Sequence, residues 1–184
     1  LIQDAIFSRP PNYGVRTGFF MGGKDAIIAL DMIDAAKKAM VPPFECSVFA
    51  DPAGSFTTAA AMVACVERVL KNKFNRGWKG AKVTVFGATG VKSAAVSKER
   101  FGVDLEPVAG ETPEQKRDII ANAEIIFAAA AAGVQVVSKA DKEIAKKLLV
   151  VADVNAVPPA GVDGMDLFMD GGQLPDSQAL GVGA

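Results

Sequence analysis

The chain has 184 residues, enough to bury one large or two small hydrophobic cores, and its 50% hydrophobic and 22% charged composition is typical of a globular protein. Its 20 basic and 21 acidic side chains give a net charge of −1, which argues against a nucleic-acid or anionic-membrane partner. The longest uncharged stretches are shorter than the roughly 18 apolar residues of a membrane span, and no signal peptide opens the chain, so we expect a cytoplasmic protein.

The sequence contains no histidine, and its two cysteines, Cys46 and Cys65, lack the spacing of metal ligands. The lack of histidine excludes histidine-dependent catalytic triads, histidine-containing zinc sites and the commonest general base. We therefore expect no metal, cysteines that pack as small apolar side chains, and an activity that survives chelation.

Strands and helices alternate in the first part of the chain. The pattern of apolar residues predicts a strand at residues 17–21, a helix at residues 25–40 and a second strand at residues 47–50. A helix then ends near Phe74, and Ser55 is its expected N-cap. This order implies parallel strands joined by a helical crossover.

The alternation continues from Lys82. Helices are predicted between four further strands, with Thr112 and Ser138 as N-caps of the last two helices. The strands are expected at residues 82–86, 104–108, 124–128 and 148–153. The chain as a whole therefore predicts an α/β fold with a parallel sheet.

The run K-V-T-V-F-G-A-T-G-V (82–91) ends a β-branched strand at two glycines. Glycine permits a tight turn and lets backbone N–H groups approach a pyrophosphate at the N-terminus of the next helix. A lone G-x-x-G fits a purely structural turn about as well as a phosphate cradle. We predict cofactor contacts at Gly87, Ala88, Thr89, Gly90 and Val91.

Two further strand ends are candidate cofactor sites, because ligands of parallel sheets bind outside the carboxyl ends of the strands. The small side chains of residues 128–133 would let a flat ligand lie close to the sheet, although a tight helix contact explains them equally well. An acid and an amide follow the strand at 148–153, ahead of a proline pair that stiffens the connection. The predicted contacts here are Ala129, Ala130, Ala131, Asp153 and Asn155.

A fourth candidate site is the segment D-P-A-G-S-F-T-T (51–58). Helix capping by Ser55 explains the serine alone, but Asp51 and two threonine hydroxyls are more polar groups than a cap requires. We predict a polar ligand here, with substrate contacts at Asp51, Ser55, Thr57 and Thr58. Asp51 and Asn155 are our candidates for catalytic residues.

Four motifs in order resemble the NAD(P)-dependent methylene-tetrahydromethanopterin dehydrogenases of one-carbon-oxidising bacteria. They are V-F-A-D-P-A-G-S-F-T-T-A-A-A-M-V-A (48–64), V-F-G-A-T-G-V (85–91), V-A-D-V-N-A-V-P-P-A-G (151–161) and A-L-G-V-G-A (179–184). The resemblance implies hydride transfer from methylene-tetrahydromethanopterin to NADP or NAD in formaldehyde oxidation. It also implies a Rossmann-type parallel sheet domain packed against a smaller α/β domain.

The resemblance implies that residues 1–76 form the pterin domain and residues 77–160 the dinucleotide-binding domain. Residues 161–184 are then a segment that returns toward the pterin domain. We expect the pterin in the cleft between the domains, a homo-oligomer, and no nucleic-acid or membrane partner. Loss of a hydride leaves a resonance-stabilised amidinium cation, so no acid or base is needed. A carboxylate such as Asp51 or Asp153 would stabilise that charge, and the sequence does not distinguish them.

Alternative functions are an NADPH-sensing module without catalysis and a methylene-tetrahydrofolate dehydrogenase. The related folate enzymes often add cyclohydrolase activity through a tyrosine followed four residues later by lysine. Here Tyr13 is followed by Thr17, so we expect no cyclohydrolase. A dehydrogenase of small acids would need cationic clamps, and the matched motifs contain no arginine.

The connection after the glycine turn is unusually short. From Val91 to the expected strand at Asp104 it barely reaches the dozen or so residues that a parallel crossover requires. Members of the family it resembles have an additional helix and strand between Val91 and Lys92. We predict that these two residues are not covalent neighbours and that about thirty residues of a βαβ unit are missing. A Cα separation beyond about 5 Å would establish the break.

Overall fold

A computed structural model describes all residues of the chain except 88–89, 109, 111, 156 and 184, and describes residues 90–93 by their backbone alone. The chain divides into two compact units, Leu1–Ala61 and Met62–Ala184. Helix α3 (Ser55–Phe74) begins in the first unit and ends in the second. The assignment of residues 1–76 and 77–160 to pterin and dinucleotide domains stays a prediction.

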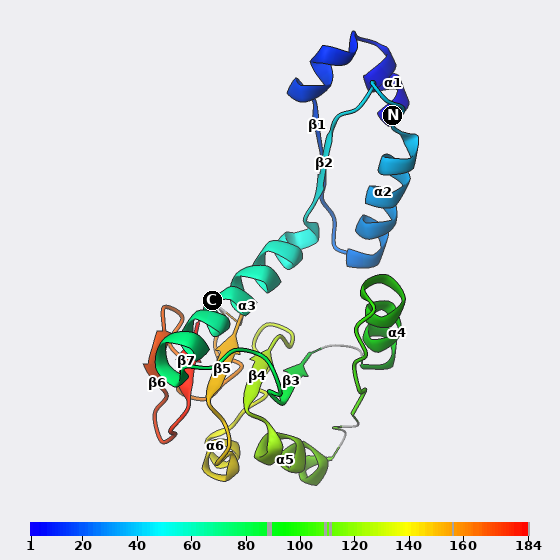
Figure 1. The fold of residues 1–184 in the computed structure, drawn as a ribbon. Helices are drawn as coiled ribbons and strands as arrows, with labels where there is room; N and C mark the ends of the chain where they lie inside the picture. Colours follow the sequence, from blue (N-terminus) through cyan, green and yellow to red (C-terminus); the bar gives the residue numbers. More distant parts are fainter. Residues whose placement is uncertain (88–89, 109, 111, 156, 184) are drawn as a thin grey trace. The chain divides into compact units, whose positions relative to one another are not determined.

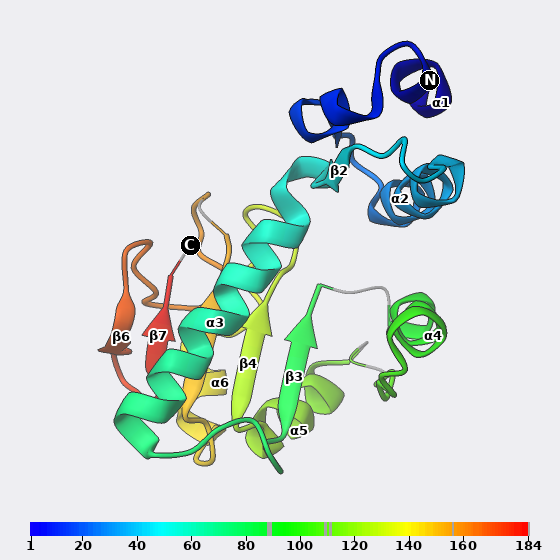
Figure 2. The same ribbon diagram turned by 45° about the horizontal axis from the view of Figure 1, so that its top comes forward.

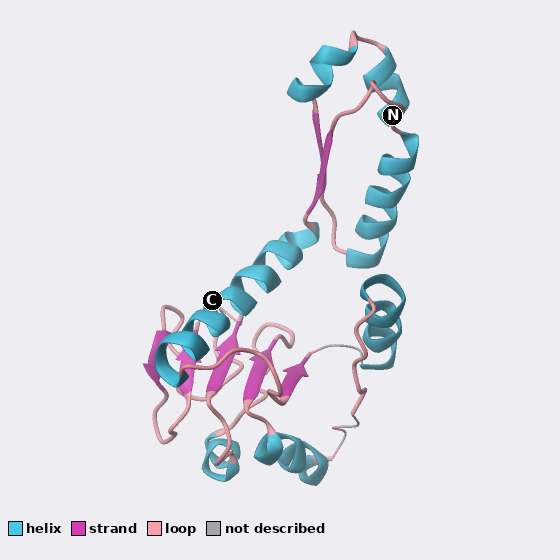
Figure 3. Ribbon diagram, in the orientation of Figure 1, coloured by secondary structure: helices cyan, strands magenta, loops and turns pink. Residues whose placement is uncertain are grey.

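The first unit is a βαβ element preceded by short helices (Figures 1 and 3). Strands β1 (Gly18–Met21) and β2 (Ser47–Ala50) pair in parallel and are joined by helix α2 (Ala26–Ala39), as predicted. Helix α1 (Ile2–Phe7) and the 3₁₀ helix η1 (Pro11–Arg16) were not predicted, and the short 3₁₀ turn η2 (Pro52–Gly54) directly precedes α3. The small core of this unit is Met21, Ala29, Ala36 and Ala50.

The second unit is built on a five-stranded sheet in the order β3-β4-β5-β7-β6. All neighbours run parallel except β6, which is antiparallel to β7. The strands are β3 (Val83–Phe86), β4 (Ile125–Ala128), β5 (Val150–Asp153), β6 (Asp170–Gln173) and β7 (Leu180–Val182). The predicted α/β class is confirmed, and residues 161–184, expected as a return segment, supply β6 and β7.

Helices cover both faces of this sheet (Figure 2). On one face Val66 and Leu70 of α3 pack against β4, β5 and β7. On the other face α5 (Pro113–Asn122) and α6 (Lys139–Ile144) bury a second cluster. Every residue of β4 and β5 is consequently buried, and apart from the final Asp153 these strands are continuous apolar runs rather than alternating ones.

The predicted capping residues of α5 and α6 are confirmed. Thr112 and Gln115 satisfy each other's backbone N–H groups at the start of α5, and Ser138 and Asp141 do the same at the start of α6. Each such capping box pairs two N–H groups that would otherwise have no partner within the helix.

The strand predicted at residues 104–108 is wrong: no regular secondary structure is present from residue 102 to 108. Val103 and Leu105 alternate with acidic residues, but Val103, Leu105 and Val108 are 48%, 49% and 58% exposed. Strand geometry depends on hydrogen bonds to a neighbouring strand, and this segment has none among the described residues.

Helix α4 (Gly90–Phe101) spans the position at which a break between Val91 and Lys92 was predicted. That break stays a prediction.

By length and composition, Pro52–Phe74 is the one stretch among the described residues that is long and apolar enough to cross a membrane. This is weak evidence for a membrane, because the core helix of a globular protein passes the same test. In α3 the side chains of Val66, Val69 and Leu70 are buried against the sheet. They form the apolar stripe of a helix that covers a sheet face.

Candidate functional site

The carboxyl ends of the parallel strands in the second unit border a hollow of about 120 Å³. Asp153 is the last residue of β5 and Gly183 follows β7, so the hollow lies where open parallel sheets bind their ligands. Its lining residues are Asp153, Asn155, Val157, Pro158, Ala160, Met165, Leu167 and Gly183. The sequence indicated the first two, whereas Met165, Leu167 and Gly183 were missed because they lie outside the predicted strands.

Asp153 is 2% exposed, and its own loop occupies both of its oxygens. Its Oδ1 accepts the N–H of Asn155 at 2.9 Å and its Oδ2 accepts the N–H of Val162 at 2.9 Å. A Cβ at Gly161 would lie 2.7 Å from Oδ1, so only glycine fits beside the carboxylate. Asp153 thus braces the loop that follows β5 and places a fixed carboxylate at the edge of the hollow.

Asn155 joins two loops of the second unit. Its Oδ1 accepts the N–H of Gly133 at 3.3 Å and the N–H of Val157 at 3.1 Å, and its Nδ2 donates to the carbonyl of Pro159 at 3.2 Å. Gly133 belongs to the loop after β4, and Val157 and Pro159 belong to the loop after β5. The amide therefore fixes the two strand-end loops against each other.

The loops after β3 and β4 also meet. The N–H of Ala129 donates to the carbonyl of Phe86 at 2.8 Å. Gly87 has φ +102°, and a Cβ there would lie 2.1 Å from the carbonyl oxygen of Ala129. The first glycine of the turn is therefore required by the neighbouring backbone whether or not a phosphate binds.

The remaining predicted cofactor contacts differ in how far the structure describes them. Ala129 and Ala131 are exposed and Ala130 is half-buried, in a loop that is not helical. Ala88 and Thr89 lie outside the described residues. Gly90 and Val91 form the first turn of α4, with their side chains outside the described part of the chain.

The segment 51–58 belongs to the first unit, where Asp51 holds the start of α3. Its Oδ1 accepts the N–H groups of Phe56 at 2.9 Å and Thr57 at 3.2 Å, and its Oδ2 accepts the Thr57 hydroxyl at 2.6 Å. The prediction that Ser55 caps this helix is wrong: Ser55 is its first residue, and Asp51 satisfies the N–H groups instead. The turn through Ala53, which has φ 51°, folds the carboxylate back over the helix.

The Thr57 hydroxyl has the largest effect on the pKa of Asp51 and lowers it. The N–H groups of Thr57 and Phe56 act in the same direction, and together they outweigh burial, which raises the pKa. The side chains of Ser55, Thr57 and Thr58 are exposed. A charged Asp51 held in one orientation, next to exposed hydroxyls, is an arrangement that can contact a polar ligand.

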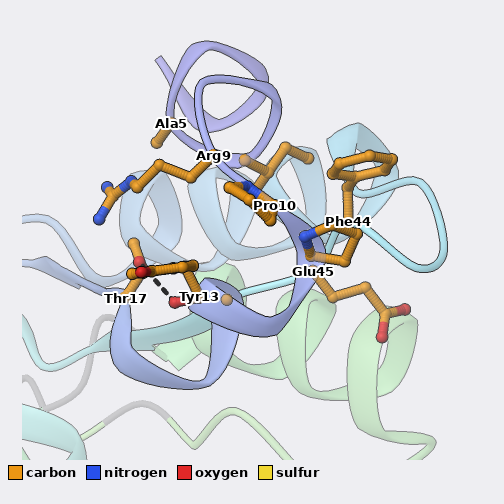
Figure 4. Close-up of a pocket in the computed structure, with 10 residues that line it drawn as sticks. Ala5, Arg9, Pro10, Tyr13, Thr17, Phe44 and Glu45 are labelled. Carbon is orange, nitrogen blue, oxygen red and sulfur yellow. Dashed lines mark hydrogen bonds between the residues drawn. The ribbon is translucent and has the colours of Figure 1, made fainter.

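A second hollow, in the first unit, lies beside Tyr13 and Thr17 (Figure 4). The Thr17 hydroxyl donates to the carbonyl of Tyr13 at 3.1 Å. The hollow measures about 10 Å³, roughly the space of a single water molecule. It has no room for a pterin ring as it stands.

Comparison with known proteins identifies the relatives of this chain. Residues 1–53 match the family model described as methylene-tetrahydromethanopterin dehydrogenase, N-terminal. The whole chain is 47% identical to the NAD(P)-dependent methylenetetrahydromethanopterin dehydrogenase of Methylorubrum extorquens and covers 71% of it. Over 98% of its length it is 27% identical to a protein of the same organism named Bifunctional protein MdtA, and it covers 70% of that protein.

The alignment with the first relative is longer than the chain. It extends over 212 positions, whereas the chain, aligned along its whole length, has 184 residues. At 28 positions or more, therefore, the relative has a residue and this chain has none.

Proposed function

The chain belongs to the NAD(P)-dependent methylenetetrahydromethanopterin dehydrogenase family, and on that premise we propose that it oxidises methylene- to methenyl-tetrahydromethanopterin during formaldehyde oxidation. NADP or NAD is the hydride acceptor. The observation that carries this proposal is the 47% identity along the whole chain. The hollow at the carboxyl ends of β5 and β7 supports it, since this is where a parallel sheet offers a ligand site.

The reaction suits a protein without histidine. One C–H bond of the pterin's methylene carbon breaks and its electron pair leaves with the hydrogen as a hydride. The positive charge spreads over that carbon and the two nitrogens that flank it, and no proton is transferred. A bound nicotinamide supplies the hydride acceptor. The protein has to hold two rings at reacting distance and tolerate the new positive charge.

The residues of the second unit fit the nicotinamide half of the cofactor. Ala129 and Ala131 present small exposed side chains, and a flat ring can lie close to such a surface. Asn155 keeps this loop in register with the loop after β5. Asp153 places a fixed carboxylate beside the same hollow, suited to offset positive charge.

The predicted substrate contacts are in the first unit. We assign Asp51, Ser55, Thr57 and Thr58 to the pterin. The orientation of Asp51, fixed by three hydrogen bonds, supports a role for its carboxylate near the developing cation. Gly87 to Val91 remain the candidates for contacts with the cofactor's phosphates, and Asp51 and Asn155 the candidates for catalytic residues.

The proposal extends to the setting of the enzyme. We propose that it acts in the cytoplasm as a homo-oligomer without a nucleic-acid or membrane partner. The near balance of 20 basic and 21 acidic side chains supports the lack of a polyanionic partner.

The test is an assay of the protein with methylene-tetrahydromethanopterin and either NADP or NAD, in which absorbance of the reduced nicotinamide is followed. Parallel reactions contain methylene-tetrahydrofolate in place of the methanopterin. We expect cofactor reduction that depends on methanopterin. Cofactor binding without reduction would favour the sensing module, and faster turnover of the folate would favour a folate dehydrogenase.

A further inference from the structure

A buried lysine lies on helix α6, outside the candidate site. Lys142 is the one basic residue that is buried among the residues the structure describes, and its side chain is 0% exposed. Its Nζ donates to the carbonyls of Asp163 at 2.8 Å and Pro175 at 2.7 Å, and it pairs with Oδ2 of Asp163 at 2.9 Å. A lysine ammonium group has three N–H donors, so these oxygen atoms leave none of them for a ligand.

The two carbonyls that Lys142 binds lie at the two ends of one segment, residues 163–175. This segment follows the β-bridge at Val162, forms β6 and ends before β7. Gly164 has φ +77°, and a Cβ there would lie 3.1 Å from the ring of Pro175 and 3.4 Å from the lysine Nζ. The start and the end of the segment are thus packed together around a single ammonium group.

Segment 163–175 also carries part of the wall of the hollow at the carboxyl ends of β5 and β7. Met165 and Leu167 line that hollow, whereas Lys142 does not. Both residues pack closely on the chain of β7. A Cβ at Gly181 would lie 2.9 Å from Sδ of Met165. A Cβ at Gly183 would lie 2.2 Å from the carbonyl oxygen of Leu167. A shift of the segment would therefore change the shape of the hollow.

Helix α6 holds Lys142 in a fixed place. The neighbouring Asp141 closes the capping box with Ser138 and accepts a hydrogen bond from Nζ of Lys116, on α5, at 3.3 Å. A buried ion pair adds little net stability, because the cost of removing its charges from water offsets their attraction. Its N–H groups are directional, however, so each of them fixes the position of one oxygen atom.

We propose that Lys142 is a positioning residue for the hollow: it holds both ends of segment 163–175 and thereby sets the affinity for the cofactor. The inference rests on the proposed function, in which NADP or NAD occupies the hollow. Loss of the ammonium group leaves the carbonyls of Asp163 and Pro175 without their donor. Met165 and Leu167 then lose the anchor that keeps them in the wall.

The test replaces Lys142 by methionine, which has a similar length and no donor. Lys146→Met is the control, because it makes the same change at an exposed lysine four residues further along the chain. Amide hydrogen exchange is measured at residues 163–169, and NADP affinity is measured by calorimetry at a temperature at which every variant is folded.

We expect Lys142→Met to lower the melting temperature by about 10 °C, since it leaves buried acceptors unpaired. Exchange at residues 163–169 should become roughly tenfold faster relative to β4, and NADP binding roughly tenfold weaker, because the site is no longer preorganised. Lys146→Met should behave like the unaltered chain in all three measurements.

A further variant separates positioning from a general loss of stability. Leu167→Ala removes a side chain of the wall directly, and the double variant shows whether Lys142 acts through that wall. In a chain that already carries Leu167→Ala, we expect Lys142→Met to weaken NADP binding by less than about threefold, because two changes that act on the same contact are not additive.

A lower melting temperature with unchanged exchange at residues 163–169 and unchanged NADP affinity would overturn the inference, because Lys142 would then serve stability alone. Losses of affinity that multiply in the double variant, or equal effects of Lys142→Met and Lys146→Met, would also overturn it. Faster exchange at residues 163–169 in Lys142→Met, when even the unaltered chain binds no NADP, would support the hold of Lys142 on the wall. That result would count against the proposed function instead, so the two proposals can fail separately.

Discussion

The side-chain oxygen of Asn155 accepts the N–H of Gly133 at 3.3 Å, so a single amide connects the loop after β5 to the loop after β4. Backbone bonds reinforce the connection further along, where Val136 and Val137 donate to the carbonyl of Gly161 at 2.7 and 3.0 Å. The two loops at the rim of the hollow are thus joined by both side-chain and backbone hydrogen bonds, and Asn155 is one of the residues that line the hollow.

Replacing Asn155 by alanine removes the acceptor for two N–H groups and the donor to Pro159. We expect kcat/KM for the cofactor to fall roughly tenfold to a hundredfold, because misplaced loops lose positioning of the reacting ring. Asn155→Asp is the matched control, since it keeps the acceptor for Gly133 and loses the donor to Pro159. Its activity should lie between those of the alanine variant and the unaltered chain. Wild-type kinetics for Asn155→Ala would show that the amide is dispensable.

The variants Asp51→Asn and Asp51→Ala distinguish two roles of Asp51, capping of helix α3 and stabilisation of the cation by its charge. Asparagine at position 51 still accepts hydrogen bonds from the N–H groups of the helix but carries no charge. Alanine neither accepts these hydrogen bonds nor carries a charge. If the carboxylate stabilises the cation, both variants lose turnover and only Asp51→Ala also loses thermal stability. We expect this pattern, with NADP affinity little changed in both. Full turnover in Asp51→Asn would show that Asp51 acts only as a helix cap.

Gly87→Ala is expected to destabilise the second unit by about 2 kcal/mol or more, from a positive φ combined with a backbone clash. The new Cβ would lie 2.1 Å from the Ala129 carbonyl oxygen. Gly77→Ala is the control, because a Cβ there meets nothing within 4 Å. Denaturant unfolding measures the free energy of unfolding of both variants. Equal stabilities would mean that the loops after β3 and β4 can move apart without loss of stability.

Acid should weaken the fold partly through Asp141. Burial raises the pKa of this carboxyl, but the N–H and hydroxyl of Ser138 and the charge of Lys116 outweigh burial and lower it below 3.8. A lowered pKa gives stability that is present above the unfolded value near 3.8 and is lost as pH falls through the folded value.

Asp141→Asn should therefore cost about 1 to 2 kcal/mol at neutral pH and flatten the acid limb of the stability curve below about pH 4. Glu143→Gln, an exposed change on the same helix, makes the same alteration in charge and should leave that limb unaltered. Melting temperatures measured between neutral pH and the acid transition check both. Parallel curves for Asp141→Asn and the unaltered chain would contradict the assignment.

Periodicity predicted the elements that carry a long apolar pattern, such as α2, α3, β4 and β5. It missed β6 and β7, since D-G-G-Q and L-G-V are short and glycine-rich and become strands only through pairing, β7 with β5 and β6 with β7. The opposite error occurred at residues 104–108, where a strand pattern lacks a partner. At the site, the polar residues were visible in the sequence, but the bond from Asn155 to Gly133 spans 22 positions and depends on how the loops fold.

Direct hydride transfer is the central claim, and an isotope experiment tests it. The pterin is prepared with deuterium on its methylene carbon and oxidised by the protein at saturating NADP. We predict that deuterium appears on the reduced nicotinamide and that none is released to water. Deuterium found in the water, or no reduced nicotinamide at saturating NADP, would contradict the claim.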